Sequence, residues 1–475
     1  MSPRQRVRRP YVLPERFRDL DPERTPIHEA DPATRARTDE EVLYAFDPLE
    51  AIYEAQRCLY CHEPRCVAAC PIGQDCREYI LEVSRGNFGN AKGIILRDNP
   101  LASTLAHVCY HYCEADCVCG VSGEPIAIRH LKRAALDYGG PEVAYARGEA
   151  RGQSVGIVGG GPAGLTAAWW LGQRGYDVTV YEGSNLLGGL ATMTIPTYRL
   201  PREAFQQDVD RLRDLGIEFV MNVRLGRDVT LAGLRDAHDA VLVAVGTHAP
   251  QLVKLPGLDL PGAWDALDYL KGMFVTGEYR VGERVAVIGG GDVAMDCARM
   301  SLRRGAKEVS IVYRRSRGEM PASDEEIAET MAEGVQFRFL TAPLRVVGEG
   351  RVSGLECQRM ELGDPDASGR RKPVPVPASN FVIPVDTVVL AIGQSADPKG
   401  LGLDDAGVTV DGEGVLVGLE GGPRTKLEDV FVAGGTSVVA AMKAGREAAT
   451  AIERHLERQV TARAVTVSPA AKAAS

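Results

Sequence analysis

Short apolar runs that end in glycines and continue into helical patterns recur from residue 154 onward. The stretch SVGIVGGGPAG starts one of them at residue 154, and LTAAWWLGQRG and a second apolar run, YDVTVYE, follow it. The same order returns from residue 284 in RVAVIGGGDVAMDCARMSLRRGAKEVSIVYRR. A strand pattern, a glycine turn, a helix pattern and a second strand pattern are typical of a β-α-β unit. The sequence therefore predicts two such units, which repeat a type of fold rather than a sequence.

Three further segments extend this α/β pattern. AVLVAVGT (240–247) and VDTVVLAIGQ (385–394) resemble each other, and each predicts a strand that runs into glycine. VFVAGGTSVVAAMKAGREAATAIERHL (430–456) predicts a strand, a glycine turn and a long helix. We therefore expect parallel sheets with helices between their strands.

The region before these units, residues 41–150, has helical patterns instead. Asp47 stands where it can cap the helix predicted for PLEAIYEAQ, and residues 76–100 predict two short helices that are split at a glycine. The second of these should end at Asn99, because proline follows. The sequence thus predicts a helical N-terminal domain followed by two Rossmann-like dinucleotide-binding domains.

Composition narrows the class of protein further. Hydrophobic residues make up 45% of the 475 residues and charged residues 25%, which is ordinary for a soluble protein of about three domains. The net charge of −9 argues against a dedicated nucleic-acid binder. No apolar run approaches the roughly 18 residues of a membrane helix, and the N-terminus lacks the apolar core of a signal peptide. We expect a cytoplasmic protein with no nucleic-acid or membrane partner.

The eleven cysteines are concentrated in one part of the chain, since nine of them fall between residues 58 and 119. An odd total without a secretion signal speaks against a disulfide framework. Ligation of a metal ion or cluster explains this density better. The second half of the group, CYHYCEADCVC, would place thiols at i and i+4 on one face if it were helical.

The cysteine spacing favours iron–sulfur clusters over zinc. Zinc commonly takes two C-x-x-C pairs, whereas CLYCHEPRCVAACP (58–71) holds one such pair and ends in Cys-Pro. A run that ends in Cys-Pro is typical of [4Fe–4S] sites, and in two-cluster versions its fourth cysteine ligates the other cluster. Zinc and unligated thiols remain the less favoured alternatives.

The first glycine loop carries the G-x-G-x-x-G pattern of a dinucleotide site. Gly161 would let backbone N–H groups approach a pyrophosphate at the helix N-terminus, and Gly164 would allow close packing of helix on strand. Glu182 ends the next strand, 18 residues after Gly164, where an acid meets the adenosine ribose. The Gly188-Gly189 pair that follows is what flavin enzymes of the two-dinucleotide-fold type use, so the pattern favours FAD over NAD. The alternative is a glycine-rich turn without a ligand.

The second loop, from Gly289 to Ala294, ends differently. The strand after it leads into Arg314 and Arg315 instead of an acid. Guanidinium groups pair with a 2′-phosphate through charge-assisted hydrogen bonds, whereas a carboxylate would repel it. We therefore expect selectivity for NADP(H), with a solvated arginine pair as the alternative. Asp292 is expected to cap the helix that follows the loop.

Together these motifs resemble the glutamate synthase small (β) subunit family. The motifs that carry the resemblance are CLYCHEPRCVAACP, CYHYCEADC, EPIAIRHLKR, GGGPAGLTAAWWL, IPTYRLP, IGGGDVAMDCAR and YRRS…EMPA, and it spans roughly residues 45–455. Relatives of this family include the N-terminal part of dihydropyrimidine dehydrogenase and the large subunit of NADH-dependent ferredoxin–NADP⁺ oxidoreductase. The resemblance implies FAD, NADP(H) and two [4Fe–4S] clusters as cofactors.

The resemblance also implies which residues bind each cofactor. One cluster would be held by Cys58, Cys61, Cys66 and Cys117, and three corners of the other by Cys70, Cys109 and Cys113. FAD would lie along Gly159, Gly160, Gly161, Pro162, Ala163, Gly164, Glu182, Gly188, Gly189, Leu190, Arg199, Leu225, Gly434, Gly435 and Thr436. NADP(H) would use Gly289, Gly290, Gly291, Asp292, Val293, Arg314, Arg315, Ala391 and Gly393.

The domain limits follow from these assignments, with the FAD domain interrupted by the NADP domain. The expected order is an arm (1–40), a helical Fe–S domain (41–150), the first part of the FAD domain (151–282), the NADP(H) domain (283–383), the second part of the FAD domain (384–458) and a flexible tail (459–475).

Three residues depart from the family pattern. The family completes its second cluster with a Glu or Gln, but Lys132 stands at that position, and an ammonium group cannot ligate iron. Cys76, Cys119 or a non-protein ligand are the alternatives, or the cluster is labile. Gly435 replaces an aspartate that helps hold the flavin, so backbone groups or Thr436 would have to take over. Cys76 stands where the family has an aliphatic residue, and a buried packing role is as well supported for it as ligation.

The expected activity is electron transfer that needs no catalytic side chain of its own, because the cofactors carry the chemistry. We expect an electron-input subunit that passes electrons from NADPH through FAD and the clusters to a partner, most readily the glutamate synthase large subunit or a ferredoxin-like acceptor, in a hetero-oligomer. Alternatives are a pyrimidine-reducing subunit, a ferredoxin–NADP⁺ reductase subunit and a non-catalytic redox sensor or assembly protein. A flavin disulfide reductase is disfavoured, because residues 183–225 contain no C-x-x-C.

Overall fold

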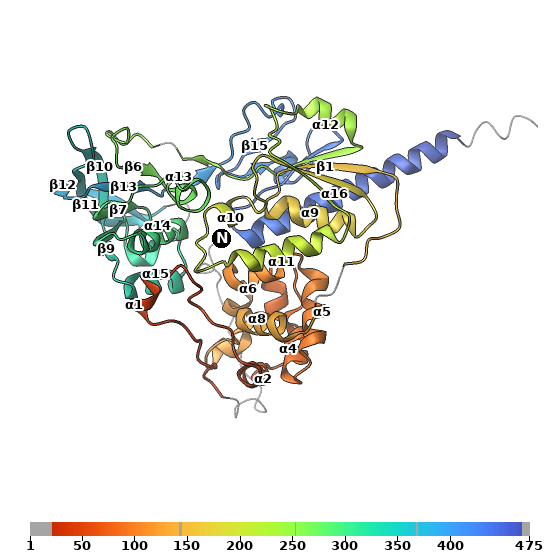
Figure 1. The fold of residues 1–475 in the computed structure, drawn as a ribbon, viewed down its shortest axis with the longest axis horizontal. Coiled ribbons are helices and arrows are strands. Elements are labelled where there is room, and N and C mark those ends of the chain that lie inside the picture. Colours follow the sequence, from red (N-terminus) through yellow and green to blue (C-terminus); the bar gives the residue numbers. More distant parts are fainter. Residues whose placement is uncertain (1–20, 142–144, 252, 367–368, 468–475) are drawn as a thin grey trace, which may run out of the picture.

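The computed structural model describes residues 21–141, 145–251, 253–366 and 369–467. A helical bundle lies at one end of the molecule, and two α/β units lie side by side above it (Figure 1). The bundle contains α2 (Pro48–Gln56), α3 (Arg65–Ala69), α4 (Cys76–Ser84), α5 (Phe88–Asp98), α6 (Ala102–Val108), α7 (Tyr112–Ala115) and α8 (Ile128–Tyr138).

The bundle forms where the sequence predicts helices. Asp47 caps α2 through a capping box with Glu50, in which each side chain accepts a hydrogen bond from the other residue's backbone N–H. The two predicted helices over residues 76–100 are α4 and α5, and Asn99 ends the second one. Their apolar faces meet α8 in one core, against which several of the cysteines pack.

The first α/β unit is a five-stranded parallel sheet in the order β17-β4-β1-β2-β3. Its strands are β1 (Ser154–Val158), β2 (Asp177–Glu182), β3 (Glu218–Met221), β4 (Ala240–Val243) and β17 (Val430–Val432). Its helices are α9 (Pro162–Gly172), α10 (Leu190–Met193), α11 (Arg202–Arg213), α12 (Leu231–Ala237) and α16 (Val438–Val467). Helix α9 is buried on nearly all sides because α16 packs across it, which explains its uniformly apolar sequence.

The second unit is another parallel sheet, in the order β6-β13-β7-β8-β9. Its strands are β6 (Ala263–Asp265), β7 (Arg284–Ile288), β8 (Glu308–Val312), β9 (Gln336–Arg338) and β13 (Thr387–Leu390). Helices α13 (Ala266–Lys271), α14 (Asp292–Arg303) and α15 (Asp324–Ala332) accompany it. An antiparallel sheet of β10 (Thr341–Val347), β11 (Gly354–Pro365) and β12 (Arg371–Ile383) is attached, and the pairs β5 (Ala249–Pro250) with β14 (Gln394–Ser395) and β15 (Thr409–Val410) with β16 (Leu416–Val417) complete the strands.

The observed units correct three of the expected limits. The second sheet includes β6 and β13, so it reaches beyond 283–383 on both sides. Helix α16 continues to Val467, so the expected tail is helical over 459–467, while residues 468–475 lie outside the described part. Residues 21–40 of the expected arm are mostly exposed but contact the second unit, since Arg303 Nε donates a hydrogen bond to the Thr38 carbonyl at 2.9 Å. Residues 1–20 of the expected arm also lie outside the described part.

Asp208 on α11 joins the helical bundle to the first sheet unit. Its carboxylate accepts hydrogen bonds from the backbone N–H groups of Ser103 and Thr104, at 3.0 and 2.7 Å, and pairs with Arg211. Helix α6 has no side-chain cap of its own, so Asp208 satisfies its first N–H groups from another unit. Asp208 is fully buried.

Replacing Asp208 with alanine should therefore destabilise the full chain by about 3–5 kcal/mol, because it removes the carboxylate that pairs with the buried Arg211 charge and that accepts from two backbone N–H groups. Chemical denaturation of the purified protein measures this. Asp210→Ala is the matched control: Asp210 lies on the same helix but is exposed, and its partners Arg213 and Gln206 lie at the helix surface, so its loss should change stability by less than about 1 kcal/mol. An equal loss in both variants would contradict the anchoring role.

Candidate cofactor-binding site

The first glycine loop has the shape that a pyrophosphate cradle needs. Gly161 is the N-cap of α9 and offers no side-chain cap, so the N–H groups of the first turn remain available. A Cβ atom added to Gly161 would meet no heavy atom within 4 Å, which shows open space on that side of the loop. A Cβ atom on Gly164 would lie 2.0 Å from the Gly159 carbonyl oxygen, so close packing of helix on loop excludes any side chain there.

Glu182 and the second glycine pair close around this loop. One Glu182 carboxylate oxygen accepts a hydrogen bond from Gly160 N at 2.8 Å, and the other accepts from the N and Oγ atoms of Ser184, both at 2.9 Å. Gly188 N donates to the Gly160 carbonyl oxygen at 2.8 Å, and a Cβ on Gly189 would lie 3.5 Å from Gly161 Cα. The structure thus brings the predicted loop, acid and glycine pair together, with α9 beginning at Pro162 and Ala163 and α10 at Leu190.

The glycine segment after β17 explains the missing aspartate. A Cβ atom on Gly435 would lie 2.4 Å from Ala441 N at the start of α16, so an aspartate does not fit this backbone. Ser437 Oγ accepts a hydrogen bond from Ala440 N at 3.3 Å and caps α16, while Thr436 is exposed. Leu225 is buried in the core that also contains Val158 at the end of β1. The FAD contacts of Leu225, Gly434, Gly435 and Thr436 stay predictions.

Arg199 contacts the second α/β unit. Its guanidinium pairs with Asp296 on α14 at 2.7 Å and with Glu326 on α15 at 2.8 Å. Burial acts to lower the pKa of Arg199, but these two carboxylates outweigh it and raise that pKa well above its usual range. Arg199 therefore fixes one nucleotide unit against the other, and its expected contact with FAD stays a prediction.

The second glycine loop lies against the end of β13. A Cβ on Gly289 would lie 2.1 Å from the Ala391 carbonyl oxygen, and Ala391 N donates to the Ile288 carbonyl at 2.8 Å. Gly393, two residues further, has a φ of 124°. The structure therefore brings Ala391 close to the loop, whereas a Cβ on Gly393 would meet the Gln251 side chain at 3.0 Å, and the NADP(H) contact of Gly393 stays a prediction.

The expected capping role of Asp292 is wrong. Gly291 is the N-cap of α14 and carries no side-chain cap, and Asp292 is already the first helical residue. Its carboxylate instead accepts hydrogen bonds from the Tyr110 hydroxyl at 2.5 Å and from Ser323 N at 3.2 Å. The glycine loop continues from Gly290 into the first turn of α14. No side chain caps the N–H groups of this turn, including that of Val293, so they are available to bind a phosphate.

The two arginines after β8 have different surroundings. Arg315 is buried, and its guanidinium pairs with Asp366 at 2.7 Å and donates to the Arg371 carbonyl at 2.8 Å. Arg314 is exposed, and within the part of the chain that the structure describes no carboxylate lies within ion-pair distance of it. Arg314 is therefore available for a 2′-phosphate, whereas Arg315 holds the β11–β12 hairpin.

The first group of cysteines surrounds one pocket in the bundle. Cys58, Cys61, Cys66 and Cys117 line it together with Cys119. Burial and the neighbouring thiols raise the pKa of Cys58 to about 12, so a thiolate there needs a nearby positive charge. Iron supplies that charge when it is bound. Among the described residues, no three His, Cys, Asp or Glu side chains meet closely enough to hold a single metal ion.

The second group forms where the chain turns between α6 and α7. Cys70, Cys109 and Cys113 are near enough for each thiolate to raise the pKa of another, and burial raises the pKa of Cys70 to about 11. This stretch is not one continuous helix, because α6 ends at Val108 and His111 has a φ of 38°, so the single helical face on which the i, i+4 spacing would place two thiols does not form. The interruption bends the chain, so Cys109 and Cys113 reach the site from two sides of a turn.

Tyr110 and Tyr112, which the sequence analysis did not single out, connect this turn to both nucleotide units. The Tyr110 hydroxyl donates to Asp292 beside the second glycine loop, and the Tyr112 side chain lies close to Ser437 beside the first. Their position between two cysteines was the feature of the sequence that could have drawn attention to these tyrosines. Sequence spacing does not reveal their partners, however, because these lie 182 residues or more away.

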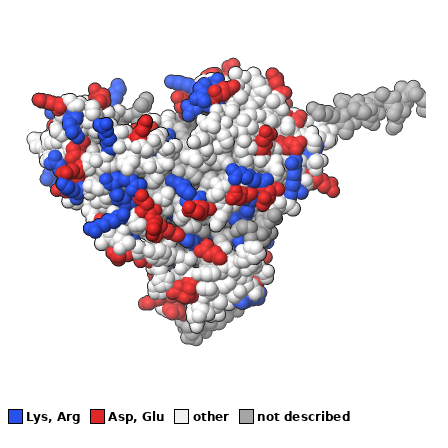
Figure 2. Space-filling model, in the orientation of Figure 1, with Lys and Arg blue, Asp and Glu red and all other residues white. Residues whose placement is uncertain are grey.

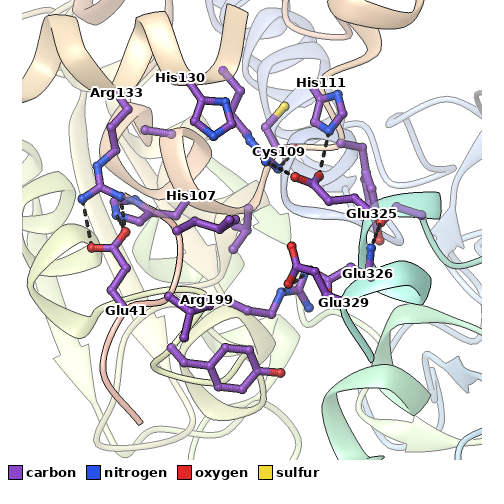
Figure 3. Close-up of a pocket in the computed structure, with 18 of the residues that line it drawn as sticks. Glu41, His107, Cys109, His111, His130, Arg133, Arg199, Glu325, Glu326 and Glu329 are labelled. Atoms are coloured by element: carbon purple, nitrogen blue, oxygen red, sulfur yellow. Dashed lines mark hydrogen bonds and ion pairs between the residues drawn. The ribbon is translucent and has the colours of Figure 1, made fainter. Parts of the chain in front are cut away.

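A pocket lies where the bundle, the first unit and the second unit meet (Figure 3). Its charged side chains are paired across it: Glu41 with Arg133 and His107, and Glu325 with Arg129 and His111. Burial lowers the pKa of His130 to about 3 and keeps this ring neutral at physiological pH. These paired charges tie the bundle to the segments packed against it at this pocket.

The molecule also presents a mixed outer surface. Acidic and basic side chains alternate over the face in Figure 2. Within the described ranges, every helix is too short or too polar to span a lipid bilayer.

The two open glycine loops and the buried Glu182 fit two dinucleotides, and the two cysteine groups fit iron–sulfur clusters. Comparison with known proteins then defines the class of protein. Residues 153–459 match the pyridine nucleotide-disulphide oxidoreductase family, and the chain belongs to it. Residues 35–142 match dihydropyrimidine dehydrogenase domain II, which carries a 4Fe-4S cluster. The protein is thus an FAD- and NADP-binding oxidoreductase with an N-terminal 4Fe–4S domain, and it is a homologue of the glutamate synthase small chains.

Individual relatives show how much of the chain is shared. The glutamate synthase [NADPH] small chain of Halomonas elongata is 34% identical over 92% of this chain and 96% of its own length. The NADP(+)-dependent formate dehydrogenase subunit beta of Moorella thermoacetica is 39% identical over 83% of this chain, but this chain spans only 60% of that protein. The structure of FprA from Mycobacterium tuberculosis in complex with NADPH has a TM-score of 0.56 at 22% identity, over 66% of this chain and 86% of that one, and shares the fold.

Proposed function

We propose that this chain takes electrons from NADPH and passes them, through FAD and two 4Fe–4S clusters, to a partner protein. The observation that best supports this proposal is the placement of the two cysteine groups. In the second group, Cys70 and Cys109 pack against the core of the first α/β unit and Cys113 against the core of the bundle, where the first-group residues Cys58, Cys66 and Cys117 also pack. The thiols therefore form a series that leads from the nucleotide units into the bundle.

The chain's own residues would position the cofactors for this transfer. The open loops at Gly161 and Gly291 place the first N–H groups of α9 and α14 where a pyrophosphate can accept their hydrogen bonds. Tyr110 and Tyr112 hold the second cysteine group against both loops. When bound, FAD supplies the exchange between a two-electron hydride and the single electrons that clusters carry.

We propose the glutamate synthase large chain as the partner. The support is that the match extends over almost the whole length of a glutamate synthase small chain, whereas it covers 60% of the formate dehydrogenase subunit. The charges on the face in Figure 2 are of both signs, which suits a protein partner better than a polyanion. Transfer of electrons to a different acceptor is one of the outcomes that the test below distinguishes.

Anaerobically purified protein tests this proposal directly. We expect NADPH to bleach the flavin absorbance, and iron and acid-labile sulfide to reach about eight atoms each per chain, as two [4Fe–4S] clusters require. Mixing with a glutamate synthase large chain should then give NADPH-dependent glutamate formation. Zinc in place of iron, or a flavin that NADPH leaves oxidised, would refute electron input, whereas transfer only to another acceptor would refute the choice of partner.

A further inference from the structure

The second cysteine group has three members, while a [4Fe–4S] cluster is held at four corners. Lys132, which occupies the position expected for the fourth ligand, is buried, and its Nζ donates a hydrogen bond to the Leu105 carbonyl at 3.2 Å. Burial raises the pKa of the Cys109 thiol, and the nearby Lys132 ammonium group opposes that rise. Lys132 therefore provides a positive charge at this site but no ligand.

Cys119 is excluded as the missing ligand by its position. It lines the pocket of the first group, lies within hydrogen-bond reach of the Cys117 thiol, and its own thiol donates to the Arg57 carbonyl at 3.5 Å. The first group already has four cysteines without it. Cys119 thus belongs with the first group.

Cys76 lies beside the gap instead. It is 2% exposed, it shares one core with Cys113 and Cys66, and its thiol donates a hydrogen bond to the Gln74 carbonyl at 3.4 Å. The thiols of Cys113, Cys66 and Cys70 lie close enough to raise its pKa. Cys66 belongs to the group that is already complete, whereas Cys113 and Cys70 belong to the group that lacks a member. Cys76 is also the first residue of α4, directly after the Asp75 that caps this helix.

We propose that Cys76 is the fourth ligand of the second 4Fe–4S cluster, with Cys70, Cys109 and Cys113. This inference rests on the proposed function, which requires the two clusters. It gives the buried Lys132 a role, because four thiolates bring more negative charge into the bundle than three, and a buried charge needs a partner. It also explains why the chain carries a cysteine and a lysine together at these two positions.

The test compares alanine variants of two cysteines that each touch another thiol. In anaerobically purified Cys76→Ala we expect iron to fall from about eight to about four atoms per chain, or a three-iron cluster to appear in the EPR spectrum, with FAD content unchanged. Cys119→Ala should keep about eight irons. If Cys76→Ala does not fold, Cys76→Ser serves, because it preserves size and should shift the EPR signal of one cluster.

The outcomes separate the two proposals. Full iron and an unchanged EPR spectrum in the Cys76 variants would show that this residue only packs in the core, and would overturn its assignment while leaving electron input intact. Only about four irons in the unmutated protein, equal to those in Cys76→Ala, would overturn both the second cluster and its ligand. Iron loss in Cys119→Ala but not in Cys76→Ala would reverse the assignment of the two residues.

Discussion

Gly161→Ala is expected to remove FAD from the protein while leaving its fold intact. A Cβ atom at this position meets no heavy atom within 4 Å, so the protein itself tolerates the methyl group. The same methyl group would stand between a pyrophosphate and the N–H groups at the start of α9. Loss of one or two charge-assisted hydrogen bonds weakens binding by about 3 kcal/mol, or roughly 100-fold. Flavin per chain after gel filtration, together with a thermal melt of flavin-free protein, measures both effects.

Two matched variants make this result specific. Gly291→Ala places a methyl group in the second loop at 3.8 Å from Pro321 Cγ, an ordinary contact, so it should retain FAD and weaken NADPH binding. Gly164→Ala would put its methyl group 2.0 Å from the Gly159 carbonyl oxygen, so it should damage the fold as well as FAD binding. FAD binding that survives in Gly161→Ala would mean that the cofactor does not approach this loop, and the assignment would fail.

The sequence was sufficient to predict both β-α-β units because their signals are local. A strand, its glycines, the helix and the acid or arginine at the end of the next strand lie within some 30 residues, and each has a steric or electrostatic reason. The sheet to which β13 belongs was not predictable in the same way. Its apolar, glycine-ended pattern also describes β4, and only pairing over some 100 residues assigns β13 to β7 and β4 to β1.

The cysteine site shows the same limit. Cys58, Cys61 and Cys66 are close in sequence, and the structure groups them as expected. The proximity of Cys76 to Cys113 depends on how α4 packs in the bundle, which spacing does not encode. The i, i+4 spacing from Cys109 to Cys113 gave a misleading signal, because the left-handed conformation of His111 breaks the helix between them.

In the second α/β unit, the largest effect on nucleotide binding is expected when an arginine after β8 is replaced. Arg314→Ala should raise the KM for NADPH by about 10- to 150-fold and leave the KM for NADH nearly unchanged, because a charge-assisted contact with a phosphate contributes about 1.5–3 kcal/mol. The reason for choosing Arg314 is that it is exposed, and no ion-pair partner is found for it among the described residues. Steady-state reduction of an artificial acceptor with each nucleotide measures the ratio.

Arg315→Ala is the matched control, one residue away and with the same charge change. Arg315 is already bound to Asp366 and to the Arg371 carbonyl, so its removal should lower stability and affect both nucleotides alike. Both variants reduce the positive charge of this edge by one, so a general electrostatic effect would lower NADPH selectivity equally in each. Loss of selectivity in Arg314→Ala alone would therefore assign the 2′-phosphate to that guanidinium, and loss in Arg315→Ala alone would show that the hairpin releases Arg315 when the nucleotide binds.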